Sequence, residues 1–157
     1  MPRPLSRPVL TALLLALVAT VLGGPATAQA DTPPAVFSAN QAVVPNGGAV
    51  TITETWTNTR SSTVTFLWLG IHPAAPHHTT WTLVSCSNCG RWGDNDATAG
   101  GSSSIPPGGT VTIAATYRTG DTGQGVDAFD GYSYSESADG NLSTLVPAAV
   151  SVTVAAS

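Results

Sequence analysis

The sequence contains no lysine, and charged side chains of any kind are scarce. The five basic residues are all arginines, and charged residues make up 9% of the chain. Arg3 and Arg7 fall in an N-terminal leader, so the rest of the chain carries three arginines against nine acidic residues, a formal charge of about −6. Such a charge repels phosphate backbones and anionic lipid headgroups. The composition therefore argues against binding to nucleic acid or to a membrane surface.

Long apolar runs are also absent, apart from one at the start of the chain. Val9–Leu22 is apolar except for two threonines, two arginines precede it, and Ala28-Gln29-Ala30 has the small-x-small pattern of a signal-peptidase site. The run is shorter than the roughly 20 residues that a membrane-spanning helix needs. We therefore expect residues 1–30 to be a cleaved signal peptide. Residues 31–157 would then be a secreted domain with no membrane attachment after cleavage.

The common signatures of catalysis are missing as well. No Gly-x-Ser-x-Gly elbow, His-Glu-x-x-His helix or phosphate-binding glycine-rich loop occurs. The only glutamates, Glu54 and Glu136, fall in predicted strands, and nothing in the sequence brings them together as a glycosidase pair. His72, His77 and His78 lie in a proline-rich connection without an acidic neighbour in sequence. We predict that the protein is not an enzyme and uses no cofactor. The alternative is an extracellular enzyme whose active site matches no familiar signature.

Alternating apolar and polar residues dominate the chain after the leader. In the run Val50–Thr57, Val50, Ile52 and Trp56 fall on one face and threonines on the other. β-Branched and aromatic residues fill similar runs, and Gly, Pro, Asn and Asp separate them. The expected strands are 35–44, 50–57, 64–71, 79–85, 111–117, 130–137 and 150–154. About seven short strands in this length predict a single all-β Greek-key sandwich.

A turn that leads into a threonine-rich strand occurs twice. The segments are PNGGAVTITETWTNTRSSTVTF (45–66) and IPPGGTVTIAATY (105–117). Both resemble the immunoglobulin-like sandwich modules of secreted bacterial surface proteins, in which a Pro-Gly-Gly start leads into such a strand and an Asn-Thr turn ends it. The resemblance covers most of residues 40–155. It implies an immunoglobulin-like fold and says little about function, because such folds host many functions.

The two cysteines lie close together in Cys86-Ser87-Asn88-Cys89. In an exported chain we expect a disulfide between Cys86 and Cys89. Closing so small a ring contributes about 2 kcal/mol, so the bond shapes the local turn more than it stabilises the domain. The alternative is a zinc site that adds the three histidines upstream, although the spacing differs from that of a standard zinc finger.

Aspartates gather in two glycine-rich stretches. Asp94-Asn95-Asp96 resembles the start of a calcium loop, but the glycine comes one place late and Ile105 stands where the final glutamate belongs. Asp121, Asp127 and Asp130 form the second group. We interpret both groups as exposed turn residues and expect no metal site. Weak extracellular calcium binding is the alternative.

The tryptophans are the best candidates for a contact surface. Trp56 falls on the apolar face of its strand and is expected in the core. Around Trp68 both faces of the strand are apolar, so one of them meets a loop, a partner or water. Trp81 lies between threonines, and Trp92 lies beside Arg91 in a predicted polar loop. A tryptophan in such a loop either caps the core or offers a flat surface to a ligand.

These observations lead us to expect a secreted, non-catalytic module that binds an extracellular protein or polysaccharide or has a structural role. The candidate contact residues, mostly in the predicted loop 86–108, are Trp68, Trp81, Arg91, Trp92, Asp94 and Asp96. An alternative is a carbohydrate-binding module in which Trp81 and Trp92 stack on sugar rings. The threonine-rich strand and its turns are similar to those of some actinobacterial cellulose-binding modules, whose cysteines usually lie near both termini instead of in mid-chain.

Overall fold

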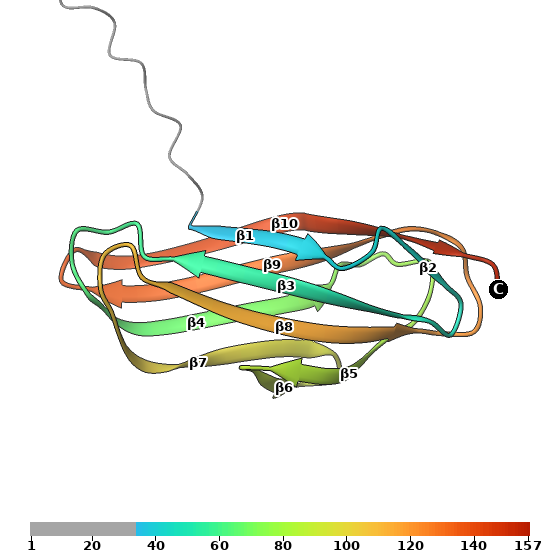
Figure 1. Ribbon diagram of the computed structural model, residues 1–157, viewed down its shortest axis with the longest axis horizontal. Coiled ribbons are helices and arrows are strands. Elements are labelled where there is room, and N and C mark those ends of the chain that lie inside the picture. The colour runs from blue at the N-terminus through green and yellow to red at the C-terminus, as the bar shows by residue number, and fades with distance from the viewer. Residues whose placement is uncertain (1–33) are drawn as a thin grey trace, which may run out of the picture. The chain divides into compact units, whose positions relative to one another are not determined.

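Ten β-strands make up the part of the chain that the structure describes, residues 34–157 of a computed structural model (Figure 1). The predicted signal peptide, residues 1–30, lies outside this range. The strands are β1 (Ala35–Ala39), β2 (Val43–Pro45), β3 (Ala49–Thr57), β4 (Val64–Pro73), β5 (Trp81–Ser87), β6 (Gly90–Trp92), β7 (Asp96–Ile105), β8 (Thr110–Thr119), β9 (Gly125–Ser137) and β10 (Gly140–Ala155). Among the described residues, no helix is long and apolar enough to cross a membrane.

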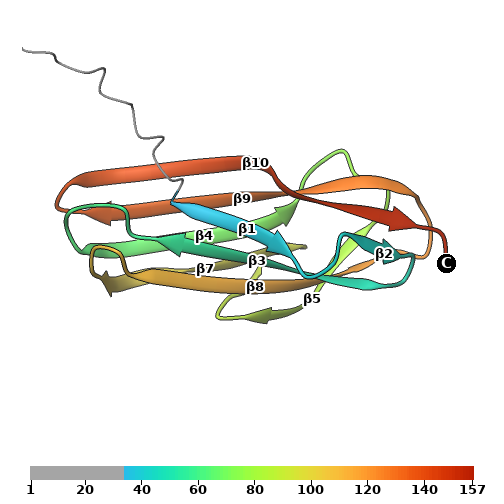
Figure 2. The same ribbon diagram turned by 45° about the horizontal axis from the view of Figure 1, so that its top comes forward.

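The strands form two sheets that pack face to face. The four-stranded sheet has the order β1-β3-β8-β5, and the six-stranded sheet has the order β2-β10-β9-β4-β7-β6. Neighbouring strands are antiparallel except for the short parallel pair of β2 and β10. Figures 1 and 2 show the sheets as two layers whose strands run along the same long direction. The prediction of a single all-β, immunoglobulin-like sandwich is confirmed.

Ten strands are present where the alternation predicts about seven, and the difference has two sources. The predicted strand 35–44 is divided between β1 and β2, which belong to different sheets. The prediction of a loop over residues 86–108 is wrong in large part, because this segment contains β6 and β7. The glycines and serines of β7 have low strand propensity, but β7 pairs with β4 on one side and β6 on the other. This pairing outweighs the local preference.

The core lies between the sheets and follows the predicted alternation. Val50, Ile52 and Trp56 of β3 are all buried. Trp81 of β5 is also in the core, with 2% of its surface exposed, and its ring meets Phe129 of β9 at a centroid distance of 5.0 Å. Burial of side chains of this size stabilises the sandwich by about 2 kcal/mol or more each.

One acidic residue shares this apolar face of β3. Glu54 is fully buried, and neither of its carboxylate oxygens has a hydrogen-bond partner among the described residues. Burial raises the pKa of Glu54 to about 8, against a smaller opposing contribution from the Gly70 backbone. The carboxyl group is therefore mostly neutral at pH 7, which is how the core accommodates it.

The two repeated turns have the same conformation. They are Pro45–Gly48 before β3 and Pro106–Gly109 before β8. In each, the last glycine donates its N–H to the carbonyl of the first proline at 2.9 Å. Gly47 and Gly108 occupy the third position with φ values of 74° and 76°, as a type II turn requires. Because β3 and β8 are antiparallel neighbours, the turns start two adjacent strands from opposite ends of the four-stranded sheet.

Candidate binding site on the six-stranded sheet

The outer face of the six-stranded sheet carries aromatic side chains from three strands. Strand alternation places Phe66 and Trp68 of β4, Trp92 of β6, and Tyr132 and Tyr134 of β9 on this face. We call these five residues the aromatic face. Their neighbours in sequence, such as Leu67 and Leu69, point into the core instead.

Two tryptophans meet on the aromatic face. The rings of Trp68 and Trp92 have centroids 5.8 Å apart and are nearly perpendicular, at 87°. They come from β4 and β6, which lie on either side of β7. Gly100 of β7 makes room for the pair, because a Cβ atom at this position would overlap the Trp68 indole. Trp92 is 62% exposed, so the pair presents an apolar corner to solvent.

A hollow of about 320 Å³ lies beside the tryptophan pair. Trp68, Trp92 and Tyr132 line it, and Leu145 of β10 closes one side. Gly70 of β4 keeps it open, because a Cβ atom there would lie 3.1 Å from the Tyr132 ring. We call this feature the aromatic hollow. Its volume is at the lower end of the range for small-ligand sites.

Polar groups border the aromatic hollow. Asp96 and Thr98 of β7 lie on one side. His72 of β4 lies at one end, and its Nε2 is 3.4 Å from Oδ2 of Asp130. The other oxygen of Asp130 accepts a hydrogen bond of 2.7 Å from the Ala148 amide. The ion pairs of the described residues involve Asp130 and Asp127 but not Asp96.

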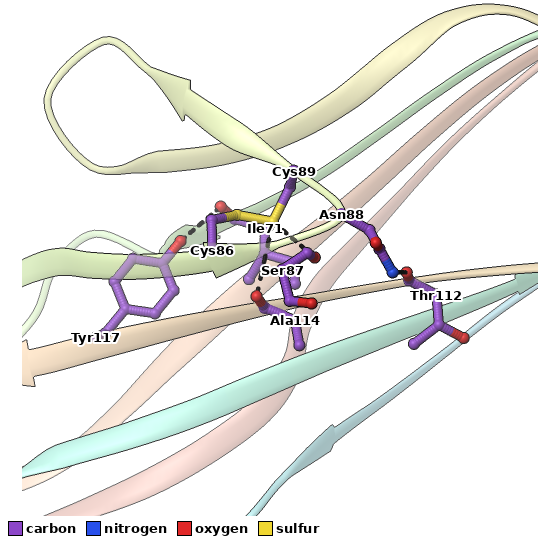
Figure 3. Close-up of a disulfide and its surroundings, with 8 residues drawn as sticks. All are labelled: Ile71, Cys86, Ser87, Asn88, Cys89, Thr112, Ala114 and Tyr117. Atoms are coloured by element: carbon purple, nitrogen blue, oxygen red, sulfur yellow. Dashed lines mark hydrogen bonds between the residues drawn. A yellow bond between two sulfur atoms is a disulfide. The ribbon is translucent and has the colours of Figure 1, made fainter.

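The disulfide turn leads into the strand that bears Trp92. β5 belongs to the four-stranded sheet and β6 to the six-stranded one, so the chain crosses between the sheets at Asn88 and Cys89 (Figure 3). The Cys86–Cys89 disulfide, with Cα atoms 5.4 Å apart, closes this crossing. Asn88 adopts a φ of 57°, which asparagine tolerates well, and its side-chain amide donates to the Thr112 carbonyl of β8 at 3.2 Å.

The predicted disulfide is therefore confirmed, and the zinc alternative is wrong. Both sulfur atoms of Cys86 and Cys89 are bonded to each other, so neither is available as a thiolate ligand. Among residues 34–157, no group of three or more His, Cys, Asp or Glu side chains lies close enough together to hold a metal ion.

The predicted contact residues separate into two groups. Trp68, Trp92 and Asp96 come together around the aromatic hollow. Arg91 instead holds the β5–β6 crossing, because its guanidinium donates to the Leu83 carbonyl and, at 3.0 Å, to the Asp94 carbonyl. Asp94 is exposed in the turn between β6 and β7 and does not line the aromatic hollow.

Trp81 requires a correction. It is buried, and its indole N–H donates to Asp127 at 2.9 Å inside the domain. A side chain in this position has no free face, so the alternative in which Trp81 and Trp92 stack together on sugar rings is wrong for Trp81. The aromatic partner of Trp92 is Trp68.

Asp127 also differs from its interpretation as an exposed turn residue. It is fully buried and accepts four hydrogen bonds: from the backbone and ring of His78 at 2.7 Å each, from the Thr79 amide, and from Trp81. Burial opposes its ionisation, but these donors outweigh burial and lower the pKa of Asp127 below its usual value. Asp127 thereby fixes the connection that precedes β5.

The sequence interpretation missed the tyrosines of the aromatic face. In β9, Ser133 and Ser135 are buried, and Tyr132 and Tyr134, which alternate with them, point outward. A predicted strand whose small polar residues and large aromatic residues alternate in this way is the signal that could have identified an aromatic outer surface. Glu136 lies on the same face and accepts a hydrogen bond of 2.7 Å from the Tyr134 hydroxyl. It is therefore well separated from Glu54 in the core.

Comparison with known proteins supports the fold. No protein-family model and no curated protein sequence matches the chain. The domain is similar in structure to a protein of Corynebacterium diphtheriae described as membrane-anchored, with a TM-score of 0.53 and 13% identity. That similarity covers 81% of this chain and 36% of the other, so this chain spans about a third of its length. At such low identity, the likeness shows a shared fold alone.

In two further similar structures, the match covers nearly the whole of the other chain. One is a type I cohesin from Pseudobacteroides cellulosolvens, with a TM-score of 0.46, 13% identity, and coverage of 78% of this chain and 93% of that one. The other is the collagen-binding subdomain of the Enterococcus faecalis surface protein ACE, with a TM-score of 0.41, 10% identity, and coverage of 79% and 97%. Both likenesses are too weak to support a functional conclusion.

Proposed function

We propose that the chain is a secreted, non-catalytic module that binds an extracellular ligand through its aromatic face. The observation that carries this proposal is the contact between Trp68 and Trp92 on the outside of the sandwich. Trp56 and Trp81 are buried in the core of this domain, whereas Trp68 and Trp92 lie together at the surface. A cluster of exposed aromatic side chains is the usual mark of an interaction site.

The aromatic face is also held in one conformation. Its side chains project from strands of a six-stranded sheet, and the disulfide turn and Arg91 hold the short strand that bears Trp92. A contact surface that is rigid before binding loses less entropy when a ligand arrives. These restraints on the strands fit a binding role.

Two features support the non-catalytic and secreted parts of the proposal. Glu54 lies in the core and Glu136 on the outer face of the other sheet, so the two glutamates do not form a carboxylate pair. The Cys86–Cys89 disulfide fits an oxidising compartment, as does the leader-like segment 1–30 with a domain from residue 31 onward.

Depletion onto insoluble material tests the proposal. The secreted protein, expressed from the full chain, is mixed with cellulose, chitin and intact bacterial cell wall, and the protein left in solution is measured. We expect the protein to bind at least one of these materials. Trp92→Ala should abolish the depletion, because the substitution removes the most exposed aromatic surface.

The matched control is Val36→Ala. Val36 is 59% exposed on β1, at the outer edge of the other sheet, so its truncation also removes exposed apolar surface but leaves the aromatic face intact. This variant should bind like the wild type. Depletion that is equal in the wild type and Trp92→Ala would contradict the proposal, as would no depletion on any of the three materials.

A further inference from the structure

The chemistry of the aromatic hollow indicates one class of ligand. We propose that the hollow holds a sugar ring of an extracellular polysaccharide whose units carry no acidic groups. This inference rests on the proposed function, because it assigns a ligand to the same face.

The rings provide the apolar part of the site. A pyranose ring has faces formed by C–H groups, and the faces of aromatic side chains are complementary to them. Trp68 and Trp92 meet at 87°, so a ligand in the corner between them contacts one indole with its face and the other with its edge. Tyr132 lines the same hollow, and the missing side chain of Gly70 leaves space beside it.

The polar border matches the edge of a sugar ring, where hydroxyl groups project. Asp96 has no ion-pair partner among the described residues, so its carboxylate oxygens can accept hydrogen bonds from hydroxyl groups. Thr98 can donate or accept, and His72 lies at the end of the hollow beside Asp130. An apolar centre with a few oriented polar groups is the usual composition of a small-ligand site.

Charge restricts the class of sugar further. Asp96 lines the hollow, and Asp130 lies beside His72 at its end. All three arginines of residues 34–157 are engaged or lie elsewhere. Arg91 donates to backbone carbonyls, Arg60 donates to Ser137 and Gly140 at the β9–β10 turn, and Arg118 lies on β8 of the other sheet. The hollow therefore repels a carboxylate or sulfate group on a sugar.

The same features argue against a protein partner at the hollow. The centres of protein interfaces are poor in charged residues and need about 800 Å² of contact on each side. Here Asp96, Asp130 and Glu136 are interspersed among the aromatic rings, and the hollow is small. Carboxylates beside aromatic rings fit a ligand rich in hydroxyl groups better than an apolar protein surface.

Tryptophan fluorescence with soluble oligosaccharides tests this inference. The secreted protein is titrated with cellohexaose, hexa-N-acetylchitohexaose and mannohexaose, which are neutral, and with hexagalacturonate, which carries a carboxylate on each unit. We expect at least one neutral hexasaccharide to change the emission in a saturable way, because the ligand would lie against Trp68 and Trp92. Hexagalacturonate should bind at least 10-fold more weakly.

Variants assign the effect to the hollow. Trp92→Ala should weaken binding of the neutral hexasaccharide by 10-fold or more, and Val36→Ala should leave it unchanged. Asp96→Asn keeps an acceptor oxygen but removes the charge, so it should reduce the discrimination against hexagalacturonate. Circular dichroism of each variant checks that the sandwich is folded.

The outcomes separate this inference from the proposed function. If no neutral hexasaccharide binds, or if hexagalacturonate binds equally well, the inference is wrong. If depletion of the protein from solution by cell wall still depends on Trp92 in that case, the aromatic face binds a ligand of another class and the proposed function stands. If depletion is independent of Trp92, both are wrong.

Discussion

At the scale of single residues, the buried carboxyl of Glu54 makes stability depend on pH. The pKa of Glu54 rises from its ordinary value of 4.5 to about 8 on folding, so the folded state holds the proton more tightly than the unfolded state. The associated stability is complete below about pH 4.5 and is lost as the pH rises through about 8. The slope within this window is about 1.4 kcal/mol per pH unit.

Urea denaturation of the wild type and Glu54→Gln at pH 5, 6.5 and 8 measures this effect. We expect the free energy of unfolding of the wild type to fall with pH more steeply than that of the neutral variant. Other titrating groups are common to both proteins, so the difference between the two curves isolates Glu54. Parallel curves would show that Glu54 ionises in the folded state as easily as in the unfolded state.

A second residue-scale prediction concerns Gly100. Replacing Gly100 with alanine places a methyl group where the Trp68 indole now lies, so the ring must move away from Trp92. We expect Gly100→Ala to weaken the near-ultraviolet dichroism of the tryptophan pair and to cost about 1–3 kcal/mol of stability through overpacking.

Gly90→Ala is the matched control for Gly100→Ala, because nothing lies within 4 Å of a Cβ atom at Gly90. We expect Gly90→Ala to leave both the near-ultraviolet dichroism and the stability close to those of the wild type. If the two variants behave alike, the close approach of Trp68 to β7 does not position the ring.

At the scale of elements, the crossing from β5 to β6 affects both the stability of the domain and the position of the aromatic face. The disulfide closes a short ring, so its removal in the Cys86→Ala/Cys89→Ala variant should lower stability by only about 2 kcal/mol. β6 has three residues and lies at the edge of its sheet, so its position depends on this crossing. The amount of protein that binds to cell wall should therefore fall substantially while the sandwich stays folded. Unchanged depletion would mean that Arg91 and the β7 pairing hold Trp92 without the disulfide.

The elements also show which parts of the fold the sequence can predict. Alternation identified strands such as β3, β8 and β9, because each has a buried face of apolar or small residues. The glycine- and serine-rich composition of β7 predicts a loop, because local composition does not report the pairing with β4 and β6 that makes it a strand. Prediction of the candidate site from sequence has the same limitation. Trp68 and Trp92 were each singled out, but their contact depends on the strand order of the sheet.

At the scale of the whole molecule, charge and fold favour the same kind of protein. The sequence is acidic and contains no lysine, which disfavours anionic partners. The sandwich has an apolar core between its sheets, and the aromatic face lies on its outside. A small sandwich with one such face is suited to the attachment to an extracellular material that we propose.

The most direct test of this account uses the four tryptophan indole N–H signals in a nitrogen-15 NMR spectrum. A soluble fragment of the material that depletes the protein is added, and each indole signal is followed. The account predicts that the signals of Trp68 and Trp92 shift, and that those of Trp56 and Trp81 in the core do not. Binding that leaves Trp68 and Trp92 unchanged would contradict the central claim, because the ligand would then lie elsewhere on the domain.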